Sequence, residues 1–196
     1  MREIMNRFFK IAVAALIIVT SAGCQGRDIE YPKAFDGILD LREWDFNTDG
    51  PVNLDGEWEF YWKKLYKPDD FKEDRTVNDR RIIEVPGSWN GYEIDGNPIG
   101  GEGYAAFRLK ILLPEDNISK SINLSAISTA HRMWINGELA SALGEVATQR
   151  EESSPKYYPK VIPVKTESNS MYQISVIAGV GSGSPLHWAA VKKSRL

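Results

Sequence analysis

Short segments in which apolar and polar residues alternate dominate the sequence after Pro51, and they constrain the fold more than any other feature. In residues 57–62 (EWEFYW), large aromatic rings occupy every second position. In residues 104–113 (YAAFRLKILL), every second residue is again apolar, and Pro114 follows directly. A period of two places alternate side chains on one face of a strand. Each segment therefore predicts a β-strand with one buried face.

The rest of the chain after Pro51 also favours strands over helices. Asn136-Gly137 favours the positive φ angles of a tight turn and predicts a hairpin at this point. No long segment has an apolar period of 3.6, and the charged residues 66–79 allow one short helical turn. Further strands are expected at residues 122–126, 131–135, 161–164 and 172–178. About seven strands at this spacing predict an all-β protein in which two sheets cover each other as a sandwich.

The N-terminus has the pattern of an export signal. The basic residues Arg2, Arg7 and Lys10 precede an unbroken apolar run over residues 11–19 and a group of small residues. This run is much shorter than the ~20 apolar residues that a membrane-spanning helix needs. The sequence therefore predicts a cleaved signal peptide over residues 1–23.

Cys24, the chain's single cysteine, directly follows Ala22-Gly23. This arrangement resembles the bacterial lipoprotein cleavage box, although Ser21 stands where a larger apolar residue is usual. The resemblance implies that Cys24 is lipidated and anchors the protein to a membrane of the cell envelope, facing the periplasm or the exterior. The alternative is a plain secretory signal with an incidental cysteine. One cysteine also excludes an intramolecular disulfide.

Length and charge indicate one module and exclude one class of partner. A chain of 196 residues has room for one domain. Residues 24–49 are mixed and polar and are interpreted as a tether, and residues 50–178 as the sandwich. Residues 179–196 are interpreted as a divergent last strand or a truncated tail. The net charge of −3, without a dense basic run after residue 10, argues against a nucleic-acid partner.

Four motifs occur in a fixed order along the predicted sandwich. They are residues 54–60 (LDGEWEF), 85–89 (VPGSW), 103–108 (GYAAFR) and 133–139 (MWINGEL). Together they resemble the landmarks of galactose-binding-like jelly-roll domains. The order, with residues 127–132 (ISTAHR), is most similar to the extracellular sensory domain of bacterial seven-transmembrane receptors with diverse intracellular signalling modules. It is more distantly similar to the sugar-binding domain of family 2 glycoside hydrolases.

The resemblance implies a jelly-roll β-sandwich that binds a ligand and does no chemistry itself. The first family implies a sensory role in signal transduction, with a receptor as partner. The second implies a carbohydrate-binding accessory domain, or a fragment of a glycoside hydrolase. A structural envelope lipoprotein, with another envelope protein as partner, remains a further alternative.

Motifs for catalysis, cofactors and metals are largely missing from the sequence. The chain has neither a nucleophile elbow nor a phosphate-binding loop, and His131 and His187 do not form a zinc motif. His131 is interpreted as a structural histidine within a strand. Residues 45–50 (DFNTDG) match the first half of a calcium loop, but position twelve is Gly56 where that loop needs a glutamate. We therefore expect no cofactor, no metal and no enzymatic activity.

Polar and aromatic residues near predicted loops supply the candidate ligand site. Trp89, Asn90, Tyr104 and Arg108 combine rings that can stack on a sugar with amide and guanidinium groups that can hydrogen-bond it. We expect this site to take a small polar ligand or a carbohydrate. The alternative for Trp89 is a plug that closes the end of the sandwich core.

Overall fold

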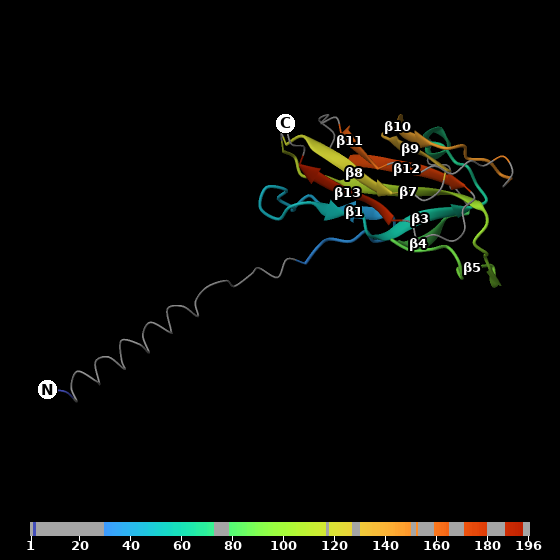
Figure 1. Ribbon diagram of the computed structural model, residues 1–196, viewed down its shortest axis with the longest axis horizontal. Helices are drawn as coiled ribbons and strands as arrows, with labels where there is room; N and C mark the ends of the chain where they lie inside the picture. Colours follow the sequence, from blue (N-terminus) through green and yellow to red (C-terminus); the bar gives the residue numbers. More distant parts are fainter. Residues whose placement is uncertain are drawn as a thin grey trace. The chain divides into compact units, whose positions relative to one another are not determined.

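A computed structural model describes residues 30–72, 79–116, 118–126, 130–149, 159–164, 171–179 and 187–193, together with Arg2 and Glu152 (Figure 1). The described residues form the strands β1 (Ile38–Asp40), β2 (Val52–Asn53), β3 (Gly56–Trp62), β4 (Arg81–Val85), β5 (Glu93–Ile94), β6 (Asn97–Pro98), β7 (Tyr104–Leu112), β8 (Lys120–Ala126), β9 (Ala130–Ile135), β10 (Glu138–Leu143), β11 (Lys160–Val164), β12 (Met171–Gly179) and β13 (His187–Lys193), and the 3₁₀ helix η1 (Pro68–Phe71). The predicted all-β class is confirmed.

The strands form two main sheets. The larger sheet has the order β10-β9-β12-β7-β3-β4, and β1 pairs with β7 in parallel beside it. The smaller sheet has the order β11-β8-β13-β2, and β5 and β6 form a separate hairpin. From β7 onward the chain passes from one sheet to the other at every connection except the β9–β10 hairpin, as in a jelly roll.

The core lies between the two sheets and is built from the predicted alternation. In β3 the side chains of Trp58 and Phe60 are buried, and Trp58 Nε1 donates a hydrogen bond of 2.9 Å to the carbonyl oxygen of Leu54. In β7, Phe107 and Leu109 are fully buried on the same side. Trp58 and Phe60 of the first motif and Phe107 of the third are thus core residues, as the alternation in residues 57–62 and 104–113 predicts.

The opposite face of the larger sheet is less exposed than a simple alternation predicts. Tyr61 and Ala106 are also buried, and they form a second apolar cluster with Ile177. Side chains of the segment after β3, among them Tyr66 and Phe71, pack over this cluster. Part of the predicted outer face is therefore covered by the chain's own loop.

The sandwich begins earlier and ends later than residues 50–178. Residues 24–49 include β1, which pairs with Lys110–Leu112, and Leu39 and Phe46 are buried in the main core. The compact unit of the structure starts at Tyr31. The tether prediction is therefore wrong for residues after 30, because sparse apolar residues without a clear period still fill core positions here.

The C-terminal residues contribute a strand, so the tail prediction is corrected in the same way. Strand β13 lies between β8 and β2 and pairs with both. Val191 is buried in the core. Residues 187–193 therefore form a last strand, as the first of the two interpretations of residues 179–196 predicts.

The predicted signal peptide and Cys24 fall outside the described residues, apart from Arg2. Within the part of the chain that is described, no helix has the length and apolar character needed to cross a membrane. The predicted hairpin at Asn136-Gly137 is confirmed, since both residues have positive φ angles of 50° and 84° between the paired strands β9 and β10.

Candidate functional site

Trp89 lies in the core and not on an exposed loop surface. Its side chain is 4% exposed. Its ring stacks on Phe107 at a centroid distance of 6.3 Å and meets Trp62 edge-on at 5.7 Å. The indole nitrogen donates a hydrogen bond of 3.3 Å to the carbonyl oxygen of Gly101. These contacts favour the alternative in which Trp89 plugs the end of the sandwich.

Arg108 faces the other side of the larger sheet. It follows Phe107 in β7, so the two side chains point to opposite faces. The Arg108 guanidinium forms a two-pronged ion pair with Glu59 on β3, through Nε and through Nη2 at 2.9 Å, and its carbon Cζ lies 4.5 Å from the centre of the Phe71 ring. The guanidinium is therefore engaged within the fold.

Glu59 is the centre of this charged cluster. Its carboxylate also contacts Arg80 at 3.3 Å and accepts a hydrogen bond of 2.8 Å from the Tyr61 hydroxyl. Burial raises the pKa of Glu59, but the hydrogen bonds and charge of Arg108, with help from Tyr61 and Arg80, lower that pKa to below its ordinary value. Burial and the Glu59 charge raise the pKa of Tyr61. Glu59 is therefore held as a paired carboxylate.

The four predicted site residues do not converge. Asn90 is exposed, and its backbone N–H donates to the Ser88 hydroxyl at 3.2 Å. Tyr104 is half-buried at the start of β7, opposite Gly179, and shares its face with Arg108. Trp89 and Asn90 thus lie at one end of the core, while Tyr104 and Arg108 belong to the other face of the sheet.

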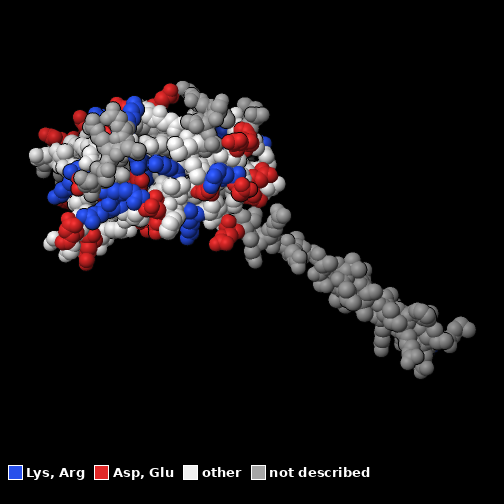
Figure 2. Space-filling view, turned by 180° about the vertical axis from the view of Figure 1, so that it is seen from behind, with Lys and Arg blue, Asp and Glu red and all other residues white. Residues whose placement is uncertain are grey.

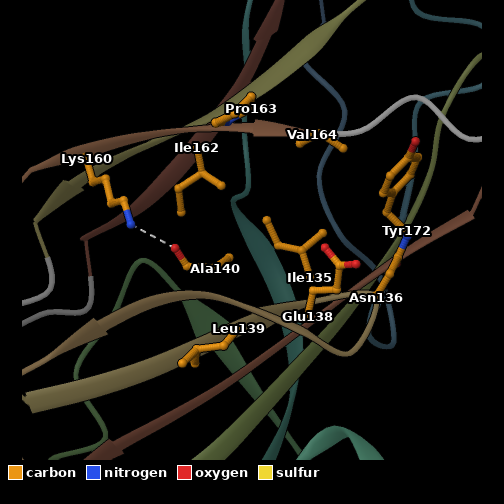
Figure 3. Close-up of a pocket in the computed structure, with 10 residues that line it drawn as sticks. All are labelled: Ile135, Asn136, Glu138, Leu139, Ala140, Lys160, Ile162, Pro163, Val164 and Tyr172. Carbon is orange, nitrogen blue, oxygen red and sulfur yellow. Dashed lines mark hydrogen bonds between the residues drawn. The ribbon is translucent and has the colours of Figure 1, made fainter.

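A cleft between the edges of the two sheets is a better candidate. It has a volume of about 390 Å³ and lies between β10, at the edge of the larger sheet, and β11, at the edge of the smaller one (Figure 3). Pockets that hold small ligands begin at about 300 Å³. The lining residues are Ile135, Asn136, Glu138, Leu139, Ala140, Lys160, Ile162, Pro163, Val164 and Tyr172.

The cleft has an apolar wall and polar groups around it. Ile135 and Ile162 come from opposite sheets, and Figure 3 shows their side chains directed into the space between the strands. Glu138 and Lys160 place a carboxylate and an ammonium group on opposite walls. Asn136 is fixed by two hydrogen bonds to the backbone of Gln173, from its own N–H at 2.9 Å and to its Oδ1 at 2.8 Å.

A bulge in β10 shapes one wall of this cleft. The register between β9 and β10 shifts between Leu139 and Ser141, so Ala140 has no partner residue in the ladder. The Ala140 carbonyl oxygen instead accepts a hydrogen bond of 2.9 Å from Lys160 Nζ on β11 (Figure 3). This bond links the two sheet edges across the cleft, and the lysine keeps further N–H donors beyond this one.

Sequence reasoning missed this cleft because its walls are far apart in the chain. The Asn136-Gly137 turn was the one local signal, since it fixes the start of β10. Nothing in the sequence shows that residues 160–164 lie opposite this hairpin across the gap between the sheets. The bulge at Ala140 also leaves no clear mark in the pattern of residues 138–143.

His131, a possible catalytic or metal-binding side chain, is buried and has a contact within the fold. His131 is 2% exposed, and its Nε2 lies 3.1 Å from the Ser141 hydroxyl across the β9–β10 pair. This contact supports the interpretation of His131 as a structural histidine. Among the residues that the structure describes, no group of three or more His, Cys, Asp or Glu side chains is placed to hold a metal.

The calcium-like segment forms a closed turn. Asp45 Oδ1 accepts a hydrogen bond of 2.8 Å from the Asn47 backbone N–H, and Asp49 Oδ2 accepts one of 3.2 Å from the Asp45 N–H. Lys193 Nζ donates to Asn47 Oδ1 at 2.8 Å. These oxygen atoms therefore stabilise the turn and fix it to β13.

Charged side chains of both signs are mixed on one face of the molecule. On the face shown in Figure 2, Lys and Arg lie among Asp and Glu, without an extended area of one sign.

Comparison with known proteins gives only distant matches. No family model and no curated protein matches the chain. Among solved structures, a β-glucuronidase from Faecalibacterium prausnitzii is 18% identical over 66% of this chain, with a TM-score of 0.46. A Ruminococcus gnavus β-glucuronidase, in complex with uronic deoxynojirimycin, is 12% identical over 73% of this chain, with a TM-score of 0.49. A β-glycosidase from Bacteroides vulgatus is 18% identical over 72%, with a TM-score of 0.47.

This chain is much shorter than those proteins. The matched part spans 21%, 29% and 20% of their respective chains. The likeness is too distant to transfer their activities to this chain.

Proposed function

We propose that this protein is an exported, lipid-anchored binding module that takes a small polar ligand of the carbohydrate class in the cleft between β10 and β11. The observation that carries this proposal is the composition of the cleft, in which apolar side chains from both sheets lie between a carboxylate and an ammonium group. A sugar has the matching chemistry, because its ring faces carry C–H groups and its edge carries hydroxyls that both donate and accept hydrogen bonds. Ile135 and Ile162 fit the ring faces, and Glu138 and Lys160 fit the hydroxyls.

The cleft supports binding more than catalysis. Glycoside hydrolysis by the usual mechanisms needs two carboxyl groups that flank the scissile bond. Among the residues that line the cleft, Glu138 is the single carboxylate. Glu59, the buried carboxylate described above, lies on the outer face of the larger sheet in an ion pair with Arg108. We therefore place the protein with non-catalytic modules.

The role of such a module depends on what it is joined to. The sequence resemblance to receptor sensory domains predicts a sensory role. The resemblance to glycosidase sugar-binding domains predicts the role of an accessory domain that binds carbohydrate. Both roles need a ligand site, so a test of the cleft addresses both. A purely structural envelope lipoprotein needs none.

The test is a thermal-shift screen of glycans and metabolites on the purified full chain, followed by titration of a hit against variants. Glu138→Gln and Lys160→Met should each weaken binding by about tenfold, the effect expected for loss of a hydrogen bond to a charged group. Glu84→Gln, an exposed glutamate on β4, is the matched control. Asn90→Ala should also leave the affinity unchanged. Unchanged binding in both cleft variants, with a loss in Asn90→Ala, would place the ligand at the loop end.

The anchor is tested separately. Native protein should partition into detergent, and Cys24→Ser should release it or leave it unprocessed, because acyl chains attached to this residue hold the protein at the membrane. A wild-type chain that stays fully soluble after export would contradict the lipid anchor.

A further inference from the structure

The N-terminal edge of the sandwich exposes large apolar side chains. Phe35 is 76% exposed, Tyr31 54% and Ile38 42%. These are three of the six large apolar side chains that are exposed in the described part of the chain, and they lie within eight residues. Single exposed apolar residues are common, but a contiguous group marks an interaction surface.

The strand register joins two of these residues to others on the same face. Phe35 and Ile38 bridge each other across a tight turn. Ile38 pairs with Lys110, and Leu112 follows two residues later on the same face of β7. Met171, which is 44% exposed, pairs with Leu112. Directly paired side chains lie about 5 Å apart and diagonal ones about 7 to 8 Å apart. We call Phe35, Ile38, Leu112 and Met171 the apolar edge patch.

Two acidic groups beside this patch are paired with arginines. Asp36 forms an ion pair of 2.6 Å with Arg80, and Asp40 forms one of 2.6 Å with Arg42. Lys110 lies within the patch and adds a positive charge on a long apolar stem. Glu57, whose carboxylate accepts a hydrogen bond of 2.8 Å from the Asp36 N–H, is a further acidic group near the patch. The surroundings thus carry both signs of charge, and Lys110 is the group within the patch that can meet anionic lipid headgroups.

The chain length limits how far this edge can be from the predicted lipid. Six residues lie between Cys24 and Tyr31, where the compact unit begins, so the connection has seven Cα–Cα steps. An extended chain spans at most about 3.5 Å per residue, so this connection reaches no more than about 25 Å. A lipidated Cys24 thus keeps the N-terminal edge of the sandwich close to the bilayer.

We propose that the apolar edge patch contacts the bilayer that holds the lipidated Cys24. The proposal rests on the lipid anchor proposed above and goes beyond it, because it fixes which face of the sandwich meets the membrane. Phe35 and Ile38 enter the headgroup region, and Lys110 meets lipid phosphates.

The test places a fluorescent probe on the patch of the full-length, membrane-anchored protein. Lipidation blocks the thiol of Cys24, so Phe35→Cys supplies one thiol for a nitrobenzoxadiazole label. Val161→Cys is the matched control, since Val161 is also apolar and 53% exposed but lies on β11. The labelled proteins are reconstituted into vesicles of phosphatidylethanolamine and phosphatidylglycerol that contain nitroxide-labelled lipid. Quenching should be at least about twofold stronger at position 35, as expected for a side chain within the headgroup region.

The outcomes separate the patch from the anchor. Protein that floats with the vesicles but shows equal quenching at both positions contradicts the patch and leaves the anchor intact. Protein that does not float contradicts both. Weak quenching at position 35, together with dimers that Phe35→Ser abolishes in sedimentation, would show that a second copy of this chain covers the patch and would overturn the bilayer as its occupant.

Discussion

Phe107 and Arg108 are consecutive residues of β7, yet they serve opposite faces of the larger sheet. Phe107 supports Trp89 and Phe60 in the core, with ring centroids 6.3 and 5.2 Å away. Arg108 neutralises Glu59 on the outer face. At the scale of single residues, alternation along one strand therefore separates groups that the sequence places side by side.

Replacement of Trp89 tests its role as a core residue. Trp89→Ala removes a ring that is 4% exposed and should lower the free energy of unfolding by about 3 to 5 kcal/mol. Denaturant unfolding followed by circular dichroism measures this change. Asn90→Ala, at the exposed neighbouring position, should change stability by no more than about 0.5 kcal/mol. A stable Trp89→Ala protein that has lost its ligand would instead support the loop-end site.

Replacement of Glu59 tests the contribution of the buried ion pair with Arg108 to stability. Glu59→Gln leaves the Arg108 guanidinium, whose side chain is 15% exposed, without its main counter-ion. Breaking one partner of such a buried pair should cost about 3 to 5 kcal/mol. Asp40→Asn breaks the exposed pair with Arg42 and should cost at most about 1 kcal/mol. Similar losses in the two variants would show that the Glu59 cluster contributes no more than a surface ion pair.

The same pair predicts a pH dependence. The pKa of Glu59 is lower in the folded protein than its ordinary value of 4.5. As the pH falls below about 4.5, the unfolded chain binds the proton first, and this favours unfolding. The stability advantage of the wild type over Glu59→Gln should therefore be complete above pH 4.5 and shrink as the pH falls through the folded pKa. An advantage that stays constant down to the acid transition would contradict this assignment.

At the scale of elements, the LDGEWEF motif joins the N-terminal segment to β3. Gly56 has a φ of 111°, and a Cβ atom there would lie 2.4 Å from the Ala34 carbonyl oxygen and 2.6 Å from its nitrogen. The Ala34 N–H donates a hydrogen bond of 2.8 Å to the Asp55 carbonyl oxygen, and the Ala34 carbonyl oxygen accepts one of 2.8 Å from the Glu57 N–H. Glycine is therefore needed so that residues 31–37 can lie against the start of β3.

A comparison of Gly56 with Gly50, which both have positive φ angles, distinguishes the cost of backbone strain from the cost of a steric clash with Ala34. Gly56→Ala should lower the free energy of unfolding by about 1 to 3 kcal/mol more than Gly50→Ala. Gly50 also has a positive φ, of 84°, but a Cβ atom there meets nothing within 4 Å. Denaturant unfolding measures both changes. Equal decreases in the free energy of unfolding would show that the N-terminal segment moves away from the added Cβ atom without loss of stability.

At the scale of the whole molecule, local patterns predict strands better than they predict where strands meet. The alternation in residues 57–62 and 104–113, and the turn at Asn136-Gly137, indicate β3, β7 and the β9–β10 hairpin correctly. Strand β1 was missed because three residues are too short to show a period. The cleft was missed because β10 and β11 become neighbours only through the stacking of two sheets, and such long-range packing leaves no local signal.

The last strand provides a test of the whole sandwich. Strand β13 lies inside the smaller sheet, with Val191 opposite both Val52 of β2 and Ile122 of β8. A chain that ends at Gly179 lacks β13 and so leaves β2 and one edge of β8 without the strand that pairs with them. It should lose cooperative thermal unfolding and aggregate, because unpaired strand edges associate. A chain that ends at Lys193 keeps β13 whole and is the control. Cooperative unfolding of the shorter chain at the wild-type temperature would show that residues up to 179 form a complete sandwich and that β13 only lies against it.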